Sequence, residues 1–192
     1  MPLSPPVERE ELHQRRYDFR GYRRDDGLWD IEGRIVDIKT YGFANYDRDY
    51  VEAGEPLHDM EIRLSVDEDF YVRDIEAVTN ASPFATCPFI ASNYQKLIGK
   101  RLGSGWRRIV REALGGTEGC THMSEMLGGM ATVAFQTMYP TLLKEGKLTP
   151  KRGQRPALLN SCHAFRSDGP VTARKWPEFY TGPVPEDPTR SD

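Results

Sequence analysis

A strict alternation of apolar and polar positions runs through the stretch HDMEIRLSV at residues 58–66. One side of the alternation carries His58, Met60, Ile62, Leu64 and Val66. The other side carries Asp59, Glu61, Arg63 and Ser65. A period of two residues is typical of a β-strand with one buried face. This stretch therefore predicts a strand whose apolar face lies on the core and whose first inward-facing position is a histidine.

The segments on either side of this strand extend the pattern into a β-meander over residues 21–80. Residues 29–35 alternate in the same way, with Trp29, Ile31 and Ile35 apolar and Asp30, Glu32 and Arg34 polar. An acidic turn at residues 67–69 leads to residues 70–79, the expected hairpin partner. A long loop over residues 41–56 joins the first two strands, and long loops in compact domains are often functional.

Residues 81–145 follow a helical period instead. Apolar residues recur at helical spacing over residues 84–102, 106–113 and 121–143, and Gly115-Gly116 is expected to end the second helix. The third helix carries an apolar stripe of Met123, Met126, Leu127, Met130, Ala134 and Met138. Thr121 is its expected N-cap, and Gly128-Gly129 within it predicts close packing or a kink. The predicted fold class is α+β, a small antiparallel sheet (meander) packed against about three helices.

The domain organisation follows from composition. With 192 residues, the chain is long enough for a real core. We expect residues 1–20 to form a charged N-terminal arm, because their apolar content is thin. Residues 21–175 are expected to form a single α+β domain. Residues 176–192 are expected to form a disordered C-terminal tail.

Composition also excludes several classes of function. A net charge of -3 argues against a nucleic-acid binder, and no apolar run approaches the roughly 18 residues of a membrane span. The N-terminus lacks the apolar segment of a signal peptide, and three unevenly spaced cysteines are typical of free thiols in a reducing compartment. The sequence has no P-loop, no G-x-G-x-x-G and no C-x-x-C. We therefore expect a cytoplasmic protein with no organic cofactor, whose partner is a small molecule. The oligomeric state stays open.

Chemically versatile residues gather in GCTHMSE at residues 119–125, where the third helix begins. His122 and Glu125 are three positions apart, so they share a helix face and suit acid/base work near neutral pH. The alternative is a capped helix start with a solvent-facing ion pair. The helix dipole and Glu125 act on the imidazole in opposite directions, so we expect the pKa of His122 to stay near its ordinary value of about 6.5.

His58 is the second candidate, because the start of a strand lies at the sheet rim, where pockets open. The alternative is a core histidine with satisfied hydrogen bonds. We expect His58 or His122 to act as a catalytic base and Asp59 or Glu125 to orient it. Arg34 is the expected cation that stabilises developing negative charge.

A metal site is weighed against these roles. If a metal is bound, its expected ligands are Cys120, His122, Cys162 and His163. Their spacing matches no common zinc pattern, and adjacent residues of an extended segment point to opposite faces. We therefore expect no metal cofactor, with zinc as the alternative. Cys120 and Cys162 can equally be small buried apolar residues.

Four motifs also carry a resemblance. They are RRDDGLWDIEG at 23–33, PLHDM at 56–60, GW at 105–106 and GCTH at 119–122. In this order they resemble a bacterial domain family of unknown function, over about residues 15–170. The resemblance implies a link to the catabolism of aromatic or acyl compounds, and it assigns no functional residue.

These observations favour a small-molecule enzyme that uses acid/base chemistry without an organic cofactor. The concrete expectation is a C–C lyase that releases a small aldehyde from an aromatic compound in a retro-aldol-like step. The first alternative is a non-enzymatic binding or accessory protein with a structural Cys/His zinc site. The second alternative is a metal-assisted hydrolase. Whether the histidines converge in space distinguishes these classes.

Overall fold

The structure is a computed structural model that describes residues 2–148 and 153–183. The chain divides into two compact units, Met1–Glu145 and Gly146–Asp192. The first unit contains the sheet and the long helices, and the second contains short helices only among its described residues.

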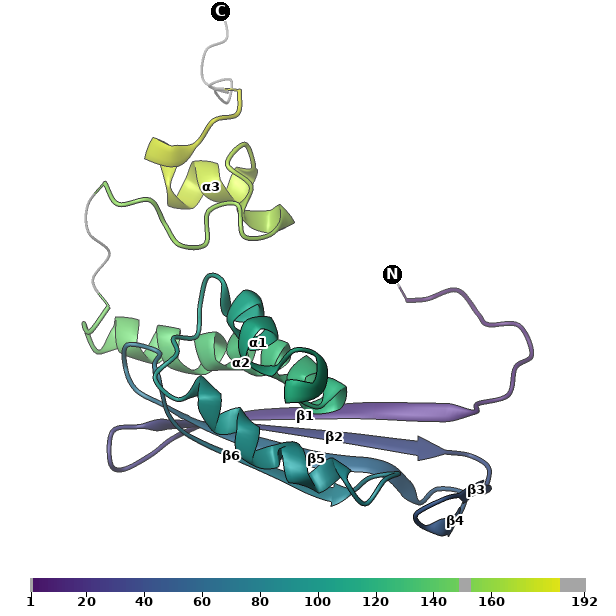
Figure 1. Cartoon of the computed structure of the whole chain (residues 1–192). Helices are drawn as coiled ribbons and strands as arrows, with labels where there is room; N and C mark the ends of the chain where they lie inside the picture. Colours follow the sequence, from purple (N-terminus) through teal and green to yellow (C-terminus); the bar gives the residue numbers. More distant parts are fainter. Residues whose placement is uncertain (1, 149–152, 184–192) are drawn as a thin grey trace, which may run out of the picture. The chain divides into compact units, whose positions relative to one another are not determined.

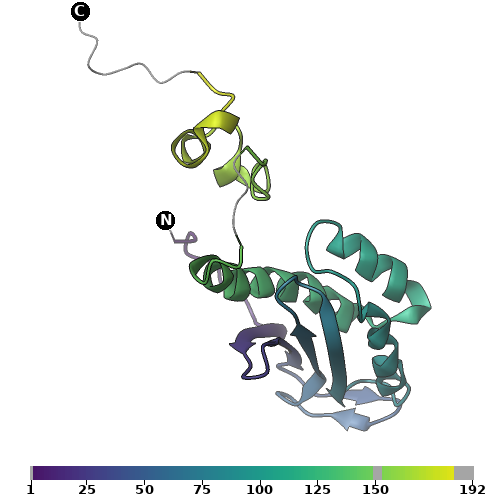
Figure 2. The ribbon, with the colours of Figure 1, turned by 90° about the vertical axis from the view of Figure 1, so that its left-hand side faces the viewer.

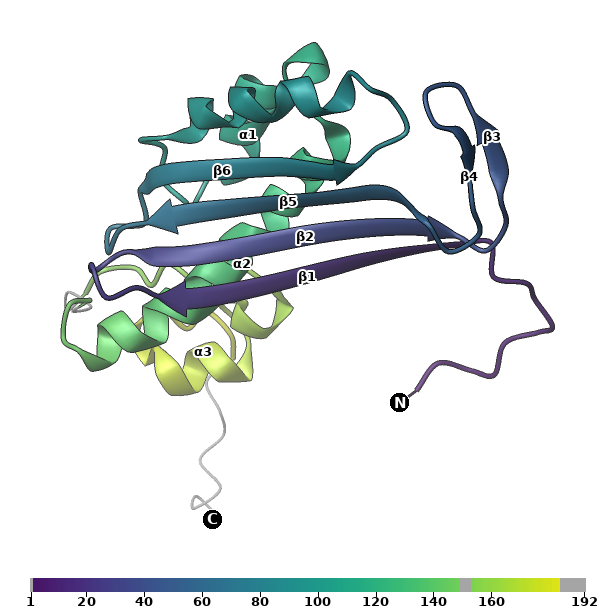
Figure 3. The same ribbon diagram turned by 90° about the horizontal axis from the view of Figure 1, so that it is seen from below.

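Within the described residues of the first unit, four long strands form one antiparallel sheet in the order β1-β2-β5-β6 (Figure 1). These strands are β1 (His13–Arg23), β2 (Trp29–Lys39), β5 (Pro56–Val66) and β6 (Val72–Ala81). A small hairpin of β3 (Phe43–Asn45) and β4 (Asp49–Val51) occupies the loop between β2 and β5 and lies at one end of the sheet (Figure 3). The predicted antiparallel meander is confirmed.

Helices cover one face of this sheet (Figure 2). They are η1 (Cys87–Leu97), α1 (Trp106–Leu114), the short η2 (Gly116–Glu118) and α2 (Thr121–Lys144). α2 crosses β1, β2 and β5, whereas η1 packs on β6 and α1 packs on α2 and η1. One covered and one exposed face explain the strict alternation in the strands. The α+β fold class is confirmed.

The core lies between the sheet and α2. Ile31 and Leu64, on the inward face of the sheet, are fully buried, as are Met123 and Met130 in the helix stripe. Removing each such side chain from water contributes roughly 1.5–3 kcal/mol. The apolar side chains that recur every two residues in the strands thus pack against those that recur every 3.6 residues in α2, and together they form a single apolar layer.

Glycines allow α2 to approach the sheet closely. A Cβ added at Gly129 of α2 would lie 2.7 Å from Phe19 Cε2 on β1. A Cβ added at Gly33 of β2 would lie 2.9 Å from Met130 Sδ. At these two positions a larger residue would require Phe19 or Met130 to shift, so close packing is the reason for glycine at 129.

Three local expectations differ from the structure. β1 begins at His13, so residues 13–20 are an edge strand and not part of an arm; an edge strand needs few apolar residues. The first predicted helix is the shorter 3₁₀ segment η1, which begins beside a proline. The N-cap of α2 is Cys120 and not Thr121.

The second unit has its own small packed centre. It contains η3 (His163–Phe165), α3 (Pro170–Lys175) and η4 (Pro177–Phe179). The rings of Phe165 and Trp176 lie 5.5 Å apart, and the buried Thr172 hydroxyl donates a hydrogen bond of 2.8 Å to the carbonyl of Arg166. Part of the segment expected as a tail is therefore ordered through η4, and residues 184–192 lie outside the described residues. Among residues 2–148 and 153–183, no helix has the length and apolar character that crossing a membrane requires.

Candidate active site

A row of three polar side chains crosses the helix-covered face of the sheet near the end that carries the β3–β4 hairpin. The strand register aligns Arg15 of β1 with Asp37 of β2, and Asp37 with His58 of β5. Asp37 continues the inward alternation of β2 two residues after the buried Ile35. With His122 of α2, these residues form what we call the Asp37 cluster: Arg15, Asp37, His58 and His122.

Asp37 is the centre of this cluster and is only 1% exposed. The Arg15 guanidinium donates from Nε to Oδ1 at 2.7 Å and from Nη2 to Oδ2 at 2.8 Å. The His58 Nδ1 lies 3.0 Å from Oδ2, and His13 Nε2 lies 3.3 Å from Oδ1. Burial acts to raise the pKa of Asp37, but the hydrogen bonds and charge of Arg15, together with His58 and His13, outweigh it and the pKa is lowered. Asp37 is therefore an ionised carboxylate at neutral pH.

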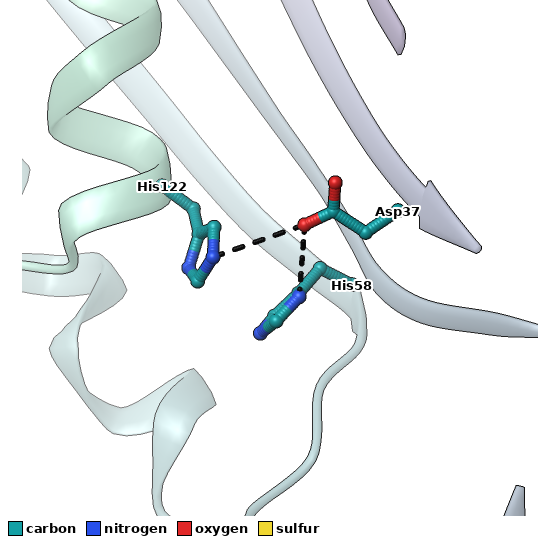
Figure 4. Close-up of side chains that lie close together, drawn as sticks. All are labelled: Asp37, His58 and His122. Atoms are coloured by element: carbon teal, nitrogen blue, oxygen red, sulfur yellow. Dashed lines mark hydrogen bonds and ion pairs between the residues drawn. The ribbon is translucent and has the colours of Figure 1, made fainter. Parts of the chain in front are cut away.

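The first turn of α2 brings His122 against His58 (Figure 4). Their ring centroids are 3.8 Å apart with a 32° tilt, and His122 Nε2 is 3.8 Å from Asp37 Oδ2. Tyr94 of η1 positions this turn, because its hydroxyl accepts a hydrogen bond from the Cys120 N–H at 3.1 Å. The two predicted histidines thus converge.

The surroundings of both imidazoles favour the neutral form by lowering their pKa values. Burial lowers the pKa of His58, the His122 charge adds to this, and Asp37 opposes it. Burial also lowers the pKa of His122, together with the Arg15 charge, against the opposing charges of Asp37 and Glu125. The expectation that the His122 pKa stays at its ordinary value is therefore wrong, because it considered neither burial nor the guanidinium of Arg15.

The hydrogen bond to Asp37 assigns the tautomer of His58. A carboxylate accepts only, so the neutral ring places its proton on Nδ1 and donates it to Oδ2. The lone pair is then on Nε2, at the other side of the ring. His58 keeps 12% of its side-chain surface exposed, so the ring is not fully enclosed by the core.

The structure places Arg34 and Asp59 elsewhere. Both lie on the opposite face of the sheet, where Arg34 donates to Asp59 from Nε at 2.8 Å and from Nη2 at 2.6 Å. The hydrogen bonds from Arg34 outweigh burial and lower the pKa of Asp59. The carboxylate that contacts His58 is therefore Asp37 and not Asp59.

Glu125 reaches the cluster indirectly. Its Oε2 accepts a hydrogen bond of 3.1 Å from Arg15 Nη1, the guanidinium that also holds Asp37. Glu125 therefore shares an arginine with Asp37 and does not contact His122 through a hydrogen bond among those described. Its side chain is 59% exposed, so it is the solvent end of this chain of contacts.

The four expected zinc ligands fall into different units. Cys120 and His122 are neighbours, with Sγ 3.8 Å from Nδ1, and both belong to the first unit. Cys162 is exposed in the second unit, where His163 Nε2 lies 2.9 Å from Arg166 Nη1. The residues that group with His122 in the structure come from β2 and β5.

Arg15 and Asp37 were missed by the sequence analysis. Asp37 had a usable signal, since it falls on the inward side of the alternation Trp29, Ile31, Gly33, Ile35 and is the one charged residue there. A charge at an inward position is expensive unless it is paired. Arg15 had no comparable signal, because only the register of β1 identifies it as the partner.

Two irregularities in the sheet flank the cluster. The register between β2 and β5 shifts between Asp37 and Ile38, and the register between β5 and β6 shifts between Asp59 and Met60. Bulges turn side chains away from the regular pleat and are over-represented beside active sites. Here they lie at the points where the apolar rows give way to Asp37 and His58.

Three side chains of the cluster are close enough together to bind one metal ion. Asp37, His58 and His122 each offer one ligand atom, and these atoms lie within 4.8 Å of one another. Two neutral imidazoles and one carboxylate suit zinc or iron(II). Both oxygens of Asp37 already accept hydrogen bonds from Arg15, so a metal ion would share Oδ2 with that guanidinium.

The fold and the cluster together define a class: an α+β domain whose helix-covered sheet face ends in a buried Asp–His cluster. Residues 13–136 match the family described as Protein of unknown function (DUF2889), so the chain belongs to this family. The resemblance drawn from the four motifs is thereby confirmed at the level of the family, and the matched range contains the whole Asp37 cluster. No curated protein and no solved structure matches the chain.

Proposed function

We propose that the chain is a small-molecule enzyme in which His58 is the general base and Asp37 orients it. The observation that carries this proposal is the hydrogen bond of 3.0 Å between His58 Nδ1 and the 1%-exposed Asp37 carboxylate. A buried carboxylate in this position holds one tautomer and stabilises the imidazolium that forms when Nε2 takes a proton.

His122 is the second functional group of the proposal. Its ring lies 3.8 Å from that of His58, and its side chain is 21% exposed. Because both rings are neutral, one can accept a proton while the other donates a hydrogen bond. Two imidazolium charges at this distance would repel each other, so the pair holds at most one added proton at a time.

The reaction we propose is the retro-aldol cleavage of an aryl compound that carries a hydroxymethyl group beside a carbonyl-activated carbon. His58 Nε2 removes the hydroxyl proton, and the O–H electron pair becomes the new C=O bond of the aldehyde. The C–C bond breaks, and its electron pair passes into the conjugated carbonyl as an enolate. The imidazolium then returns the proton to the enolate carbon. No oxidant and no organic cofactor are required.

Aldehyde release from β-hydroxypropiophenone and ring-substituted relatives tests this proposal. Wild type should release formaldehyde and the matching acetophenone in equal amounts. His58→Gln should lower the turnover by about 10²–10⁴-fold, the usual contribution of a general base. Glu32→Gln is the control variant, since Glu32 pairs with Arg63 on the exposed face of the sheet, away from the Asp37 cluster. Absence of aldehyde from the wild type, or equal turnover in His58→Gln, would refute the proposal.

A second candidate is a metal-assisted hydrolase, and the ligand atoms of Asp37, His58 and His122 within 4.8 Å favour it. A bound zinc ion would supply a water molecule with a pKa lowered to about 7. Titration of the full chain with Co²⁺ and visible spectroscopy tests for binding at these residues. Tight binding that is lost in Asp37→Asn and His122→Gln supports this candidate. Aldehyde release that survives chelation supports the metal-free base.

A further inference from the structure

A groove runs between α1 and α2 on the surface of the first unit, with a volume of about 530 Å³. Ligand pockets typically have volumes of about 300–1,000 Å³. The apolar part of its lining comes from α1, where Trp106, Val110 and Leu114 are each at most 8% exposed. The groove is therefore large enough for an aromatic ring system and has a preformed apolar wall.

Two arginines on α1 give this groove a positive charge. Arg107 and Arg111 are one helical turn apart, and both line the groove. Within residues 2–148 and 153–183, no carboxylate pairs with either guanidinium. By contrast, Arg108, which does not line the groove, donates to Glu112 at 3.2 Å. The positive charge that faces the groove is thus not neutralised by the described part of the chain.

The wall of the groove that α2 provides contains a glycine, which leaves space there. Gly128 of α2 lines it, and a Cβ added there would have Arg107 Nε, 3.9 Å away, as its nearest neighbour. A helix usually disfavours glycine by about 1 kcal/mol relative to alanine. Contact with the sheet explains Gly129, but Gly128 contacts nothing that requires glycine. What it provides is space in the groove.

The groove reaches the Asp37 cluster through two of its lining residues. Cys120 lies 3.8 Å from His122 Nδ1 through its Sγ, and Glu125 accepts a hydrogen bond from Arg15. Glu125 is the one carboxylate in the lining, and Arg15 already engages it. His58 and His122 do not line the groove, so a molecule in it is linked to the cluster through Cys120 and Glu125 and meets two unpaired cations.

We propose that this groove binds an aromatic carboxylate, with the ring against Trp106 and the carboxylate between Arg107 and Arg111. Guanidinium groups form strong, charge-assisted hydrogen bonds with carboxylates. This inference goes beyond the proposed function, because the groove is a binding site of its own next to the Asp37 cluster. Its test needs no turnover, so the two can fail separately.

Calorimetric titration of the full chain with naphthoate, and with naphthamide as the uncharged analogue, tests the proposal. Wild type should bind naphthoate about 10-fold or more tightly than naphthamide, as expected for hydrogen bonds to a charged group. Arg107→Gln/Arg111→Gln should abolish this preference, whereas Arg108→Gln should keep it. His58→Gln should bind naphthoate like the wild type even if aldehyde release is lost.

Gly128→Leu provides an independent steric test. The added side chain would project into the groove, and leucine favours the helix, so the variant should fold and lose binding of both compounds. The proposal is overturned if wild type does not bind naphthoate, if the arginine variants bind it as tightly as wild type, or if Gly128→Leu leaves binding unchanged. If naphthoate binding fails in one of these ways but His58→Gln still abolishes aldehyde release, this inference is wrong and the proposed function stands.

Discussion

Alanine should stabilise the fold at Gly128 of α2 but not at the adjacent Gly129. A helix-interior Gly→Ala change favours folding by about 1 kcal/mol. At Gly128 the nearest atom to the new Cβ is 3.9 Å away, which is ordinary contact, so nearly all of this gain should appear. At Gly129 the new Cβ would lie 2.7 Å and 2.8 Å from two ring atoms of Phe19.

The magnitude at Gly129 follows from these distances. Forcing an extra carbon into a packed contact typically costs about 1–3 kcal/mol. Offset by the helix gain of about 1 kcal/mol, Gly129→Ala should be neutral to about 2 kcal/mol less stable than wild type. The two variants should therefore differ in unfolding free energy by roughly 1–3 kcal/mol.

Urea unfolding of the full chain, followed by circular dichroism, measures this difference as a shift in midpoint at constant slope. Phe19→Leu combined with Gly129→Ala should recover part of the loss, because leucine lacks the ring atoms that the new Cβ meets. A Gly129→Ala variant as stable as Gly128→Ala would refute the close approach of α2 to β1.

The remaining predictions concern charge and exposure. Asp37→Asn should destabilise the chain by about 1–3 kcal/mol, because it removes the charge that the half-buried Arg15 faces. Glu32→Gln on the exposed face should change stability by at most about 1 kcal/mol, and the midpoints of urea unfolding compare the two variants. The pKa of Asp59 in the folded chain lies below its ordinary value of 3.8, so its stabilisation is present above that pH and is lost as the pH falls below it. Asp59→Asn should consequently flatten the fall in thermal stability below about pH 4, and an unchanged slope would contradict the role of its arginine partner. Cys162 is the exposed thiol among the three cysteines, so Cys162→Ser should remove the fastest phase of alkylation by iodoacetamide.

The local periods in the sequence were enough to predict the fold class. The alternation in residues 58–66 identified the inward face of β5, and the methionine stripe identified the inward face of α2, because burial acts on single side chains at regular spacing. The same reasoning placed His58 on the inward face. It could not distinguish an edge strand of low apolar content from an arm, so β1 was missed.

Only the tertiary structure determined the composition of the site. Asp37 contacts Arg15 and His58, which are 22 and 21 positions away in the chain, and both contacts depend on the register of neighbouring strands. A shift of one residue in either pairing would turn these side chains to opposite faces of the sheet. His122 joins them only because α2 docks against the sheet through glycine contacts and a methionine layer. Local propensity acts over a few residues, whereas register and helix docking are settled by the packing of the whole core. The sequence alone could therefore identify two histidines but not the carboxylate that joins them.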